Sequence, residues 1–407
     1  MQQMDRRDFT KALLAMSASA GMSGAAVAEQ EPSGGVPSLA VRVNDKIRLG
    51  GQRNFDRGPV TSRQNMQWHQ RWGIRYLDVS LETRNAAPDV FGSDTPDEGA
   101  LARAQALGTG MGGARLQPTT RWSLEGMMRI ADTLQKNDLI WESIRMDSAY
   151  IAMAPGPERD RYLDLICENV QTAGRAGVKI ISYHWNLTPI RRNRKVQGRG
   201  GSEYDAFKLE DNWRDLPPTP AGRVSADDYW ERLHVWASRV IPVAAESGVK
   251  MACHPYDPGG LPLGYLGVDS FDAGDYANAL LKYEKLYDSP HNGFQYDTGV
   301  SRESMPEGVD QLALLYGLIK RKKIHQIHFR NVRASQNDFV EVYHDEGDVD
   351  LFNIIRLLRD SGGSLLADHS PRHQDDPSYV IGFAFANGYI LGLLRAAHEE
   401  ALKSIAR

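Results

Sequence analysis

Residues that can bind a metal ion follow four short apolar runs in the second half of this 407-residue sequence. One such residue stands at the end of each run: His254, Asp297, His328 and Asp368. Two imidazoles and two carboxylates suit Mn²⁺, Fe²⁺, Co²⁺ or Zn²⁺ better than Ca²⁺ or Mg²⁺. Taken singly, each His could be an ordinary buried histidine and each Asp a helix cap. Their recurrence at one topological position predicts a metal centre, provided that the run ends converge.

The apolar runs alternate with longer amphipathic segments, which predicts βαβ units and a parallel sheet. Strands are expected at 75–80, 113–116, 139–144, 178–183, 249–254, 294–297, 324–329 and 364–368. Helices are expected at 123–136, 158–174, 226–247, 273–287, 306–321 and 351–360, with Ser123 as an N-cap and Gly177 and Gly248 just past helix ends. Eight strands close a (β/α)8 TIM barrel, whose strand ends meet at one mouth. The alternative, an open doubly wound sheet, is disfavoured because no G-x-G-x-x-G motif follows a first strand.

The N-terminus resembles a twin-arginine export signal. Arg6 and Arg7 precede a small-residue apolar stretch, and Ala26-Val27-Ala28 offers a cleavage site after Ala28. We therefore expect a signal peptide at 1–28, an irregular, Pro/Gly-rich lead-in or linker at 29–60, a single barrel domain at 61–407, and an exported, periplasmic protein. No later segment forms a run of 18 apolar residues, so no stable membrane anchor is expected.

Composition excludes several classes of function. Charged residues make up 25% of the chain, the net charge is −4, and the pI is about 6.3, so no basic surface for nucleic acid is expected. The two cysteines, Cys167 and Cys253, are too few for a disulfide framework and are expected to be buried thiols.

Several motifs resemble the mannonate dehydratase family over roughly residues 120–400. They are Arg199-Gly200-Gly201 with Phe207, 241–244 before Gly248-Val249, His254-Pro255-Tyr256-Asp257-Pro258, Asn292-Gly293-Phe294, His328-Phe329-Arg330-Asn331-Val332-Arg333, 339–350, Asp368-His369, and the run from Gly388. The resemblance implies a xylose-isomerase-like TIM barrel that dehydrates D-mannonate to 2-keto-3-deoxy-D-gluconate, in hexuronate catabolism, with a divalent metal. The implied ligands are His254, Asp297, His328 and Asp368, and the implied catalytic residues are His369 and Tyr379.

The chain departs from the family pattern at three positions near the expected mouth. Asp297 stands where the family has Cys, His184 stands where it has Asn, and Tyr256 replaces an Asp. A carboxylate is a harder ligand than a thiolate, so the metal preference shifts toward Mn²⁺ or Mg²⁺, with Fe²⁺ and Co²⁺ also suitable.

The substrate is expected to be a small-molecule sugar acid. Arg330 and Arg333 are candidates to hold its carboxylate, and their alternative is a role in surface ion pairs. His184 and Asp257 are further candidates for substrate binding. The sequence leaves a homo-oligomer open.

Two other functions fit the same residues. One is an exported sugar epimerase, isomerase or oxidised-glycoside lyase of the same barrel group, which the three departures and the export signal favour. The other is a non-catalytic sugar-acid binding protein, which would have no need of the acid–base pair His369 and Tyr379.

Overall fold

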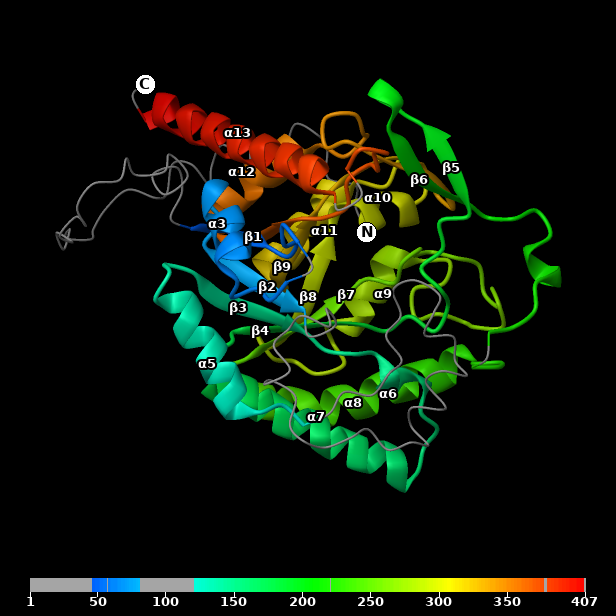
Figure 1. The fold of residues 1–407 in the computed structure, drawn as a ribbon. Helices are drawn as coiled ribbons and strands as arrows, with labels where there is room; N and C mark the ends of the chain where they lie inside the picture. Colours follow the sequence, from blue (N-terminus) through cyan, green and yellow to red (C-terminus); the bar gives the residue numbers. More distant parts are fainter. Residues whose placement is uncertain (1–45, 57, 81–120, 220, 377–378, 406–407) are drawn as a thin grey trace.

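Eight parallel strands form a closed barrel in the computed structural model, which describes residues 46–56, 58–80, 121–219, 221–376 and 379–405 (Figure 1). The order around the barrel is β1-β12-β9-β8-β7-β4-β3-β2. Their bounds are β1 Ile47–Gly51, β2 Tyr76–Ser80, β3 Ile140–Arg145, β4 Ile180–His184, β7 Lys250–His254, β8 Asn292–Asp297, β9 Ile324–Phe329 and β12 Gly363–Ala367. The predicted TIM barrel is confirmed.

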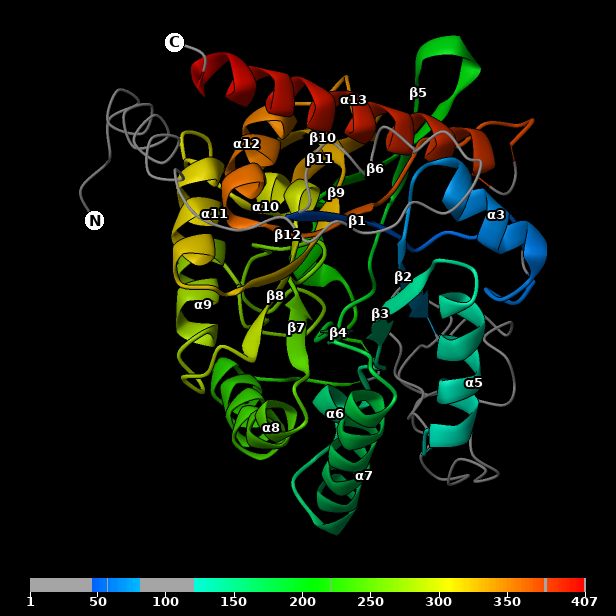
Figure 2. The ribbon, with the colours of Figure 1, turned by 90° about the vertical axis from the view of Figure 1, so that its left-hand side faces the viewer.

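Helices surround the barrel, as Figures 1 and 2 show from two directions. They are α3 Arg63–Arg71, α5 Leu124–Gln135, α6 Ala149–Ala152, α7 Pro157–Arg175, α8 Ala226–Glu246, α9 Tyr276–Tyr283, α10 Thr298–Ser304, α11 Gln311–Lys320, α12 Leu351–Ser361 and α13 Val380–Ile405, with 3₁₀ turns at Arg199–Gly201 and Trp213–Asp215. The predicted caps are confirmed. The Ser123 side chain accepts from the Gly126 N–H, and Gly177 and Gly248 have φ of 88° and 67° after α7 and α8.

A four-stranded antiparallel sheet projects beside the barrel, in the order β10-β11-β6-β5 (Figure 1). Its strands are β5 Arg194–Gln197, β6 Glu203–Lys208, β10 Asn331–Ser335 and β11 Asp338–Val342. The sequence prediction did not include this sheet. It matters for the site because its strands and the loop before β5 bring Glu341 and Arg192 to the barrel mouth.

The sequence analysis missed the first barrel strand, whereas the strand expected at 75–80 coincides with β2. β1 lies inside 29–60, the stretch expected to be irregular, whereas the expected strand at 113–116 lies outside the described residues. β1 is short and ends in Gly50-Gly51, so it has little apolar signal of its own. Pairing with β12 and β2 on its two sides supplies the hydrogen bonds that make it a strand.

Replacing Gly51 by Ala is expected to destabilise the protein by about 1–3 kcal/mol, because the added methyl overpacks this corner. A Cβ there would lie 2.4 Å from Nδ1 of the buried His69 and 3.0 Å from Ile74 Cγ2. The matched control is Gly388→Ala on an exposed face of α13, where no atom lies within 4 Å and a gain of about 0.5–1 kcal/mol is expected. Urea unfolding measures both. Equal stability of the two variants would contradict the close packing of β1.

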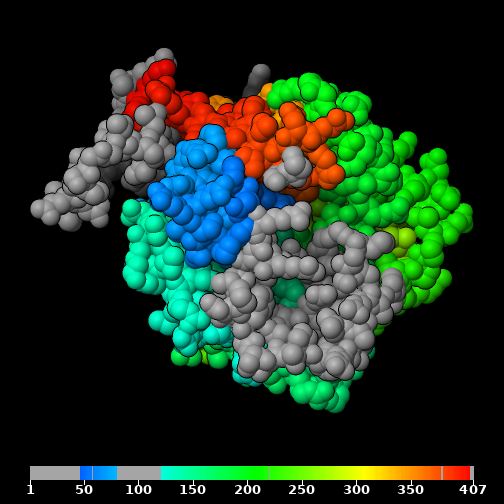
Figure 3. All heavy atoms as spheres, viewed as in Figure 1, coloured from blue at the N-terminus to red at the C-terminus, as the bar shows by residue number. Residues whose placement is uncertain are grey.

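The predicted signal peptide at 1–28 lies outside the described residues. Among those that are described, the segment Val380–Lys403 of α13 is long and apolar enough to cross a membrane, with a hydropathy of 1.5. α13 packs on α12 and β12, and Figure 3 shows it at the surface beside the α3 region. This is the ordinary place of a barrel helix. The expected absence of a membrane anchor stays a prediction.

Candidate metal centre and active site

Three predicted ligands meet at the carboxyl ends of adjacent strands. His254 ends β7, Asp297 ends β8 and His328 lies near the end of β9, and the register pairs Asp297 with His328. One ligand atom from each residue lies within 4.8 Å of the others. Asp297 Oδ2 is 3.5 Å from His254 Nε2 and 3.8 Å from His328 Nδ1. These atoms therefore face one point, as ligands of one ion would.

The fourth predicted ligand joins this cluster from β12. Asp368 follows the last residue of that strand, and its Oδ2 lies 3.5 Å from His328 Nδ1. The Gln52 amide donates to the other carboxylate oxygen of Asp368 at 2.7 Å, which directs Oδ2 toward the imidazole. The structure thus brings together all four residues that the sequence singled out.

The protonation states of the imidazoles fit a metal ion. His254 Nδ1 lies 2.7 Å from the Pro255 carbonyl, which can only accept, so Nδ1 carries a proton and Nε2 is the nitrogen that faces Asp297. Burial lowers the pKa of His328 to about 3, so this ring is neutral. Its buried Nδ1 has no hydrogen-bond partner in the described part of the chain. A buried nitrogen between two carboxylates with nothing to bind is suited to a cation.

Asp297 also caps a helix, so the same side chain is both a helix cap and a candidate metal ligand. Its Oδ1 accepts from the Val300 N–H at 2.7 Å at the start of α10, while Oδ2 faces the imidazoles. Burial alone would raise the pKa of Asp297, but Arg330 and His254 hold it well below its usual range. The pKa of Asp368 is lowered in the same way by His369 and His328 against burial. Both are ionised, as ligands must be.

His184 borders the cluster, whereas Asp257 does not face it. The His184 ring stacks on His254, with centroids 3.9 Å apart, because the two residues pair in register on β4 and β7. Asp257 is buried and binds the Arg192 guanidinium through both oxygens, at 2.9 and 3.0 Å. Its carboxylate is occupied by a structural ion pair, so the geometry does not favour the predicted role in substrate binding.

Neither of the two arginines predicted to hold the substrate is placed for that role. Arg330 is fully buried, with Nε 3.0 Å from Asp297 and Nη2 3.3 Å from Glu303, and it supports the candidate ligand Asp297. Arg333 is exposed on β10, over the Tyr204 ring at 6.0 Å. Neither presents a guanidinium to the cluster for a substrate. The sequence could not show this, because both arginines follow β9 and their directions depend on tertiary contacts.

Of the two predicted catalytic residues, only His369 touches the cluster. Its Nε2 is 3.4 Å from Asp368 Oδ2 and its Nδ1 is 2.8 Å from Glu341. Burial alone would lower the pKa of His369, but Glu341 and Asp368 outweigh it and raise the pKa to about 9. The Tyr379 hydroxyl instead accepts from Arg372 Nε at 2.9 Å, and no described contact joins it to the cluster.

Four supporting residues were missed by the sequence analysis: Gln52, Arg145, Glu303 and Glu341. Glu303 lies on α10 and Glu341 on β11, and both are buried against Arg330. Burial raises the pKa of Glu303 to about 8, although Arg330 opposes the shift. Glu341 lies in the segment 339–350 that resembles the family, whereas the sequence offers no signal of this kind for Gln52, Arg145 and Glu303.

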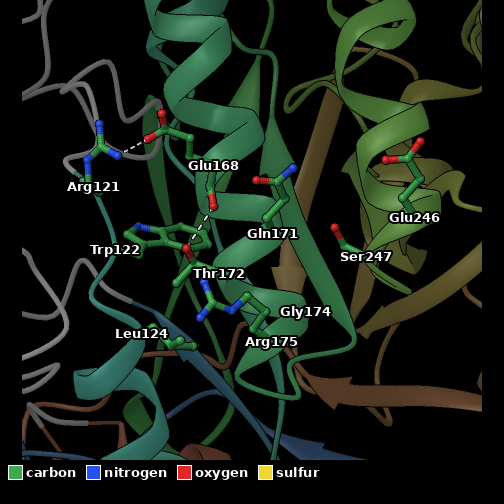
Figure 4. Close-up of a pocket in the computed structure, with 10 residues that line it drawn as sticks. All are labelled: Arg121, Trp122, Leu124, Glu168, Gln171, Thr172, Gly174, Arg175, Glu246 and Ser247. Carbon is green, nitrogen blue, oxygen red and sulfur yellow. Dashed lines mark hydrogen bonds and ion pairs between the residues drawn. The ribbon is translucent and has the colours of Figure 1, made fainter.

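A separate cavity of about 660 Å³ lies outside the barrel, between the ends of α7 and α8 (Figure 4). Charged side chains line it, among them Glu168 and Arg175 on α7 and Glu246 at the end of α8. None of the predicted site residues borders this cavity. It has no part in the cluster described above.

Eight parallel strands with a His/Asp cluster at their carboxyl ends are the arrangement of a TIM-barrel enzyme, and the cluster has the spacing of a candidate metal site. The fold is shared with a xylose isomerase domain protein from Planctomyces limnophilus, with a TM-score of 0.51 at 12% identity over 88% of this chain and 99% of that one. The mannonate dehydratase from Streptococcus suis serotype 2 has a TM-score of 0.63 at 22% identity, over 87% and 94% of the two chains.

Sequence comparison points to the same relatives. Residues 220–404 match the family model of D-mannonate dehydratase (UxuA). A mannonate dehydratase from Streptococcus equi subsp. zooepidemicus is 27% identical over 374 residues, which is 82% of this chain and 96% of the relative. One from Thermotoga petrophila is 27% identical over 318 residues, or 68% and 86%. The resemblance found in the sequence is confirmed: the chain is a TIM-barrel protein that is similar to mannonate dehydratases.

Proposed function

We propose that the protein is a metal-dependent hydro-lyase that dehydrates D-mannonate, or a related sugar acid, to 2-keto-3-deoxy-D-gluconate. The observation that carries the proposal is the cluster of His254, Asp297, His328 and Asp368, with His369 at its edge, in a mannonate dehydratase-like barrel. The same contacts support these four side chains as the ligand set.

We infer that Mn²⁺ is the metal, with Fe²⁺, Co²⁺ and Mg²⁺ as the next candidates, because two carboxylates make the donor set harder than one with a thiolate. A bound divalent ion would stabilise, as a Lewis acid, negative charge developing on the substrate oxygens. Elemental analysis of the purified protein tests the choice of metal.

His369 is the general acid that we propose for this reaction. The reaction removes a proton from the carbon beside the carboxylate and expels hydroxide from the next carbon, which leaves as water once it is protonated. His369 carries a proton at neutral pH because Glu341 and Asp368 flank its ring. It is therefore suited to protonate the leaving hydroxyl. A role for Tyr379 as the partner base stays a prediction.

His369→Gln is expected to lower kcat by about 10²–10⁴, the usual contribution of one general acid. The measurement is release of 2-keto-3-deoxy acid from D-mannonate, detected by colour, with protein loaded with Mn²⁺. The metal content should stay at the wild-type level, because His369 is not among the proposed ligands. Full activity of this variant would remove His369 from the mechanism.

The decisive test of the reaction is incubation of the protein with D-mannonate and each of the four metals. Formation of the keto-deoxy acid is expected, most rapidly with Mn²⁺. No product with any of them would exclude the mannonate assignment. The same mixtures, examined by NMR for epimerised or isomerised sugars, test the alternative within this barrel group. The curated relatives named above favour the dehydratase.

We also propose that the protein is exported and acts on its substrate outside the cytoplasm. The twin-arginine pattern at Arg6-Arg7 and the cleavage site after Ala28 support this proposal. The proposal is supported by the sequence alone. Fractionation of cells expressing the full chain, with N-terminal sequencing of the mature protein, tests it. A protein retained in the cytoplasm with residues 1–28 intact would overturn it.

A further inference from the structure

An arginine that the sequence analysis did not consider reaches the cluster from another strand. Arg145 is the last residue of β3, at the carboxyl end of the barrel where the candidate ligands gather. Its Nη2 lies 3.4 Å from His328 Nε2 on β9 and 3.3 Å from Gln295 Oε1 on β8. Its side chain is half-buried, so the guanidinium borders both the cluster and the mouth.

Arg145 has no carboxylate partner in the part of the chain that the structure describes, and its buried Nε has no hydrogen-bond partner there either. The other arginines of the mouth differ. Arg192 binds Asp257 and Glu341, and Arg330 binds Asp297 and Glu303. A partly desolvated guanidinium without a counter-ion is costly, and a carboxylate ligand is the group that matches its donors. The charge balance of the mouth therefore leaves a place for one anion at Arg145.

Hydrogen bonds across the barrel interior hold this guanidinium in place. Gln295 Oε1 accepts from Arg145, and the Gln295 amide nitrogen donates to Gln326. Gln326 donates to Ser143 Oγ at 2.9 Å, and Ser143 donates to the Asp78 carboxylate at 2.7 Å. Because the carboxylate can only accept, every donor in this series points from Arg145 toward Asp78. The orientation of Gln295 is thereby set before any ligand arrives, as a binding site requires.

We propose that Arg145 binds the carboxylate of the substrate and selects sugar acids over neutral sugars. The identity of that acid as mannonate rests on the proposed function, whereas the recognition of a carboxylate does not. Arg145 takes the role that the sequence gave to Arg330 and Arg333. A carboxylate held there lies beside His328, so the carbon that loses its proton is next to the cluster.

The test compares binding of D-mannonate with binding of D-mannitol, its uncharged analogue, by calorimetry with Mn²⁺-loaded protein. All proteins in this comparison carry His369→Gln, so that mannonate is not consumed during the titration, and wild type here refers to Arg145. The wild type is expected to prefer the acid. Arg145→Ala should lose about 10- to 100-fold in affinity for mannonate and nothing for mannitol, which corresponds to one charge-assisted contact. Arg145→Lys should bind mannonate with an affinity between those of the wild type and Arg145→Ala. Arg129→Ala, on the exposed face of α5, is the matched control and should equal the wild type.

The outcomes separate this inference from the proposed function. If mannonate is not turned over but sugar acids bind in a manner that depends on Arg145, the reaction is wrong and the carboxylate subsite stands. If mannonate is turned over and Arg145→Ala keeps its affinity for the acid, the subsite is wrong and the reaction stands. Equal affinity of the wild type for mannonate and for mannitol would also overturn the carboxylate subsite at Arg145. Arg145→Gln, which can keep a contact with Gln295, replaces Arg145→Ala if that variant does not fold, and the same 10- to 100-fold loss is expected.

Discussion

Replacing His328 by Gln is expected to abolish activity and to weaken metal binding by more than about 100-fold, since loss of a residue that only hydrogen-bonds to a metal ligand already costs about 10- to 100-fold. His328 Nδ1 lies between Asp297 and Asp368, within 3.8 Å of both, so it is the central donor of the proposed set. Asp368→Asn should behave alike, because an amide is a poorer and uncharged ligand. Elemental analysis after dialysis, together with formation of the keto-deoxy acid, measures the two effects.

His325→Gln provides the matched control for this experiment. His325 is also buried and lies on β9, three residues earlier, where its ring packs against Gly293 rather than facing the ligands. This variant should keep its metal even where its stability changes. A full metal content in both His328→Gln and Asp368→Asn would show that the ligand assignment is wrong.

Arg330→Leu is expected to lower the free energy of unfolding by about 3–5 kcal/mol, the usual cost of removing one partner from a buried ion pair. The fully buried guanidinium lies 3.0 Å from Asp297, 3.3 Å from Glu303 and 3.6 Å from Glu341. Without it, these carboxylates are buried without their main counter-charge. Urea unfolding at pH 7 measures the loss.

The pH dependence of this loss has a definite sign. In the variant, the folded-state pKa of Glu303 rises further above the unfolded value, because the opposing Arg330 is gone. Such a group contributes stability below the unfolded pKa, near 4, and this contribution disappears as the pH rises through the folded pKa. Wild-type Glu303 already has a pKa of about 8, so its contribution falls in parallel in both proteins up to that pH, and the difference between variant and wild type should grow above about pH 8. Arg239→Leu, which breaks an exposed pair with Asp164, should cost less than about 1 kcal/mol at any pH. If Arg330→Leu also lowered the free energy of unfolding by less than about 1 kcal/mol, the structural role of Arg330 would be contradicted.

The sequence predicted the barrel and the four clustered residues because both depend on local signals. The strand at 324–329 coincides with β9, and the helix expected at 226–247 with α8 to within one residue. A polar residue that ends a buried run is visible in the sequence, and parallel strands bring such residues to the same edge. Because the strands run parallel, the position of each residue at a strand end was enough to predict that His254, Asp297, His328 and Asp368 lie together.

The tertiary structure alone decided which charges are paired. Arg145 ends β3, Arg330 follows the last residue of β9 and Arg333 lies on β10. The first borders the cluster, the second is buried among carboxylates and the third is exposed. Arg145 meets a residue 183 positions away, and Arg330 meets Glu303 through a helix that packs on β10. β1 likewise is a strand because it pairs with β12 and β2. A side chain's role in binding depends on whether its charge is already neutralised, and that depends on contacts between segments far apart in the chain, which no local pattern records.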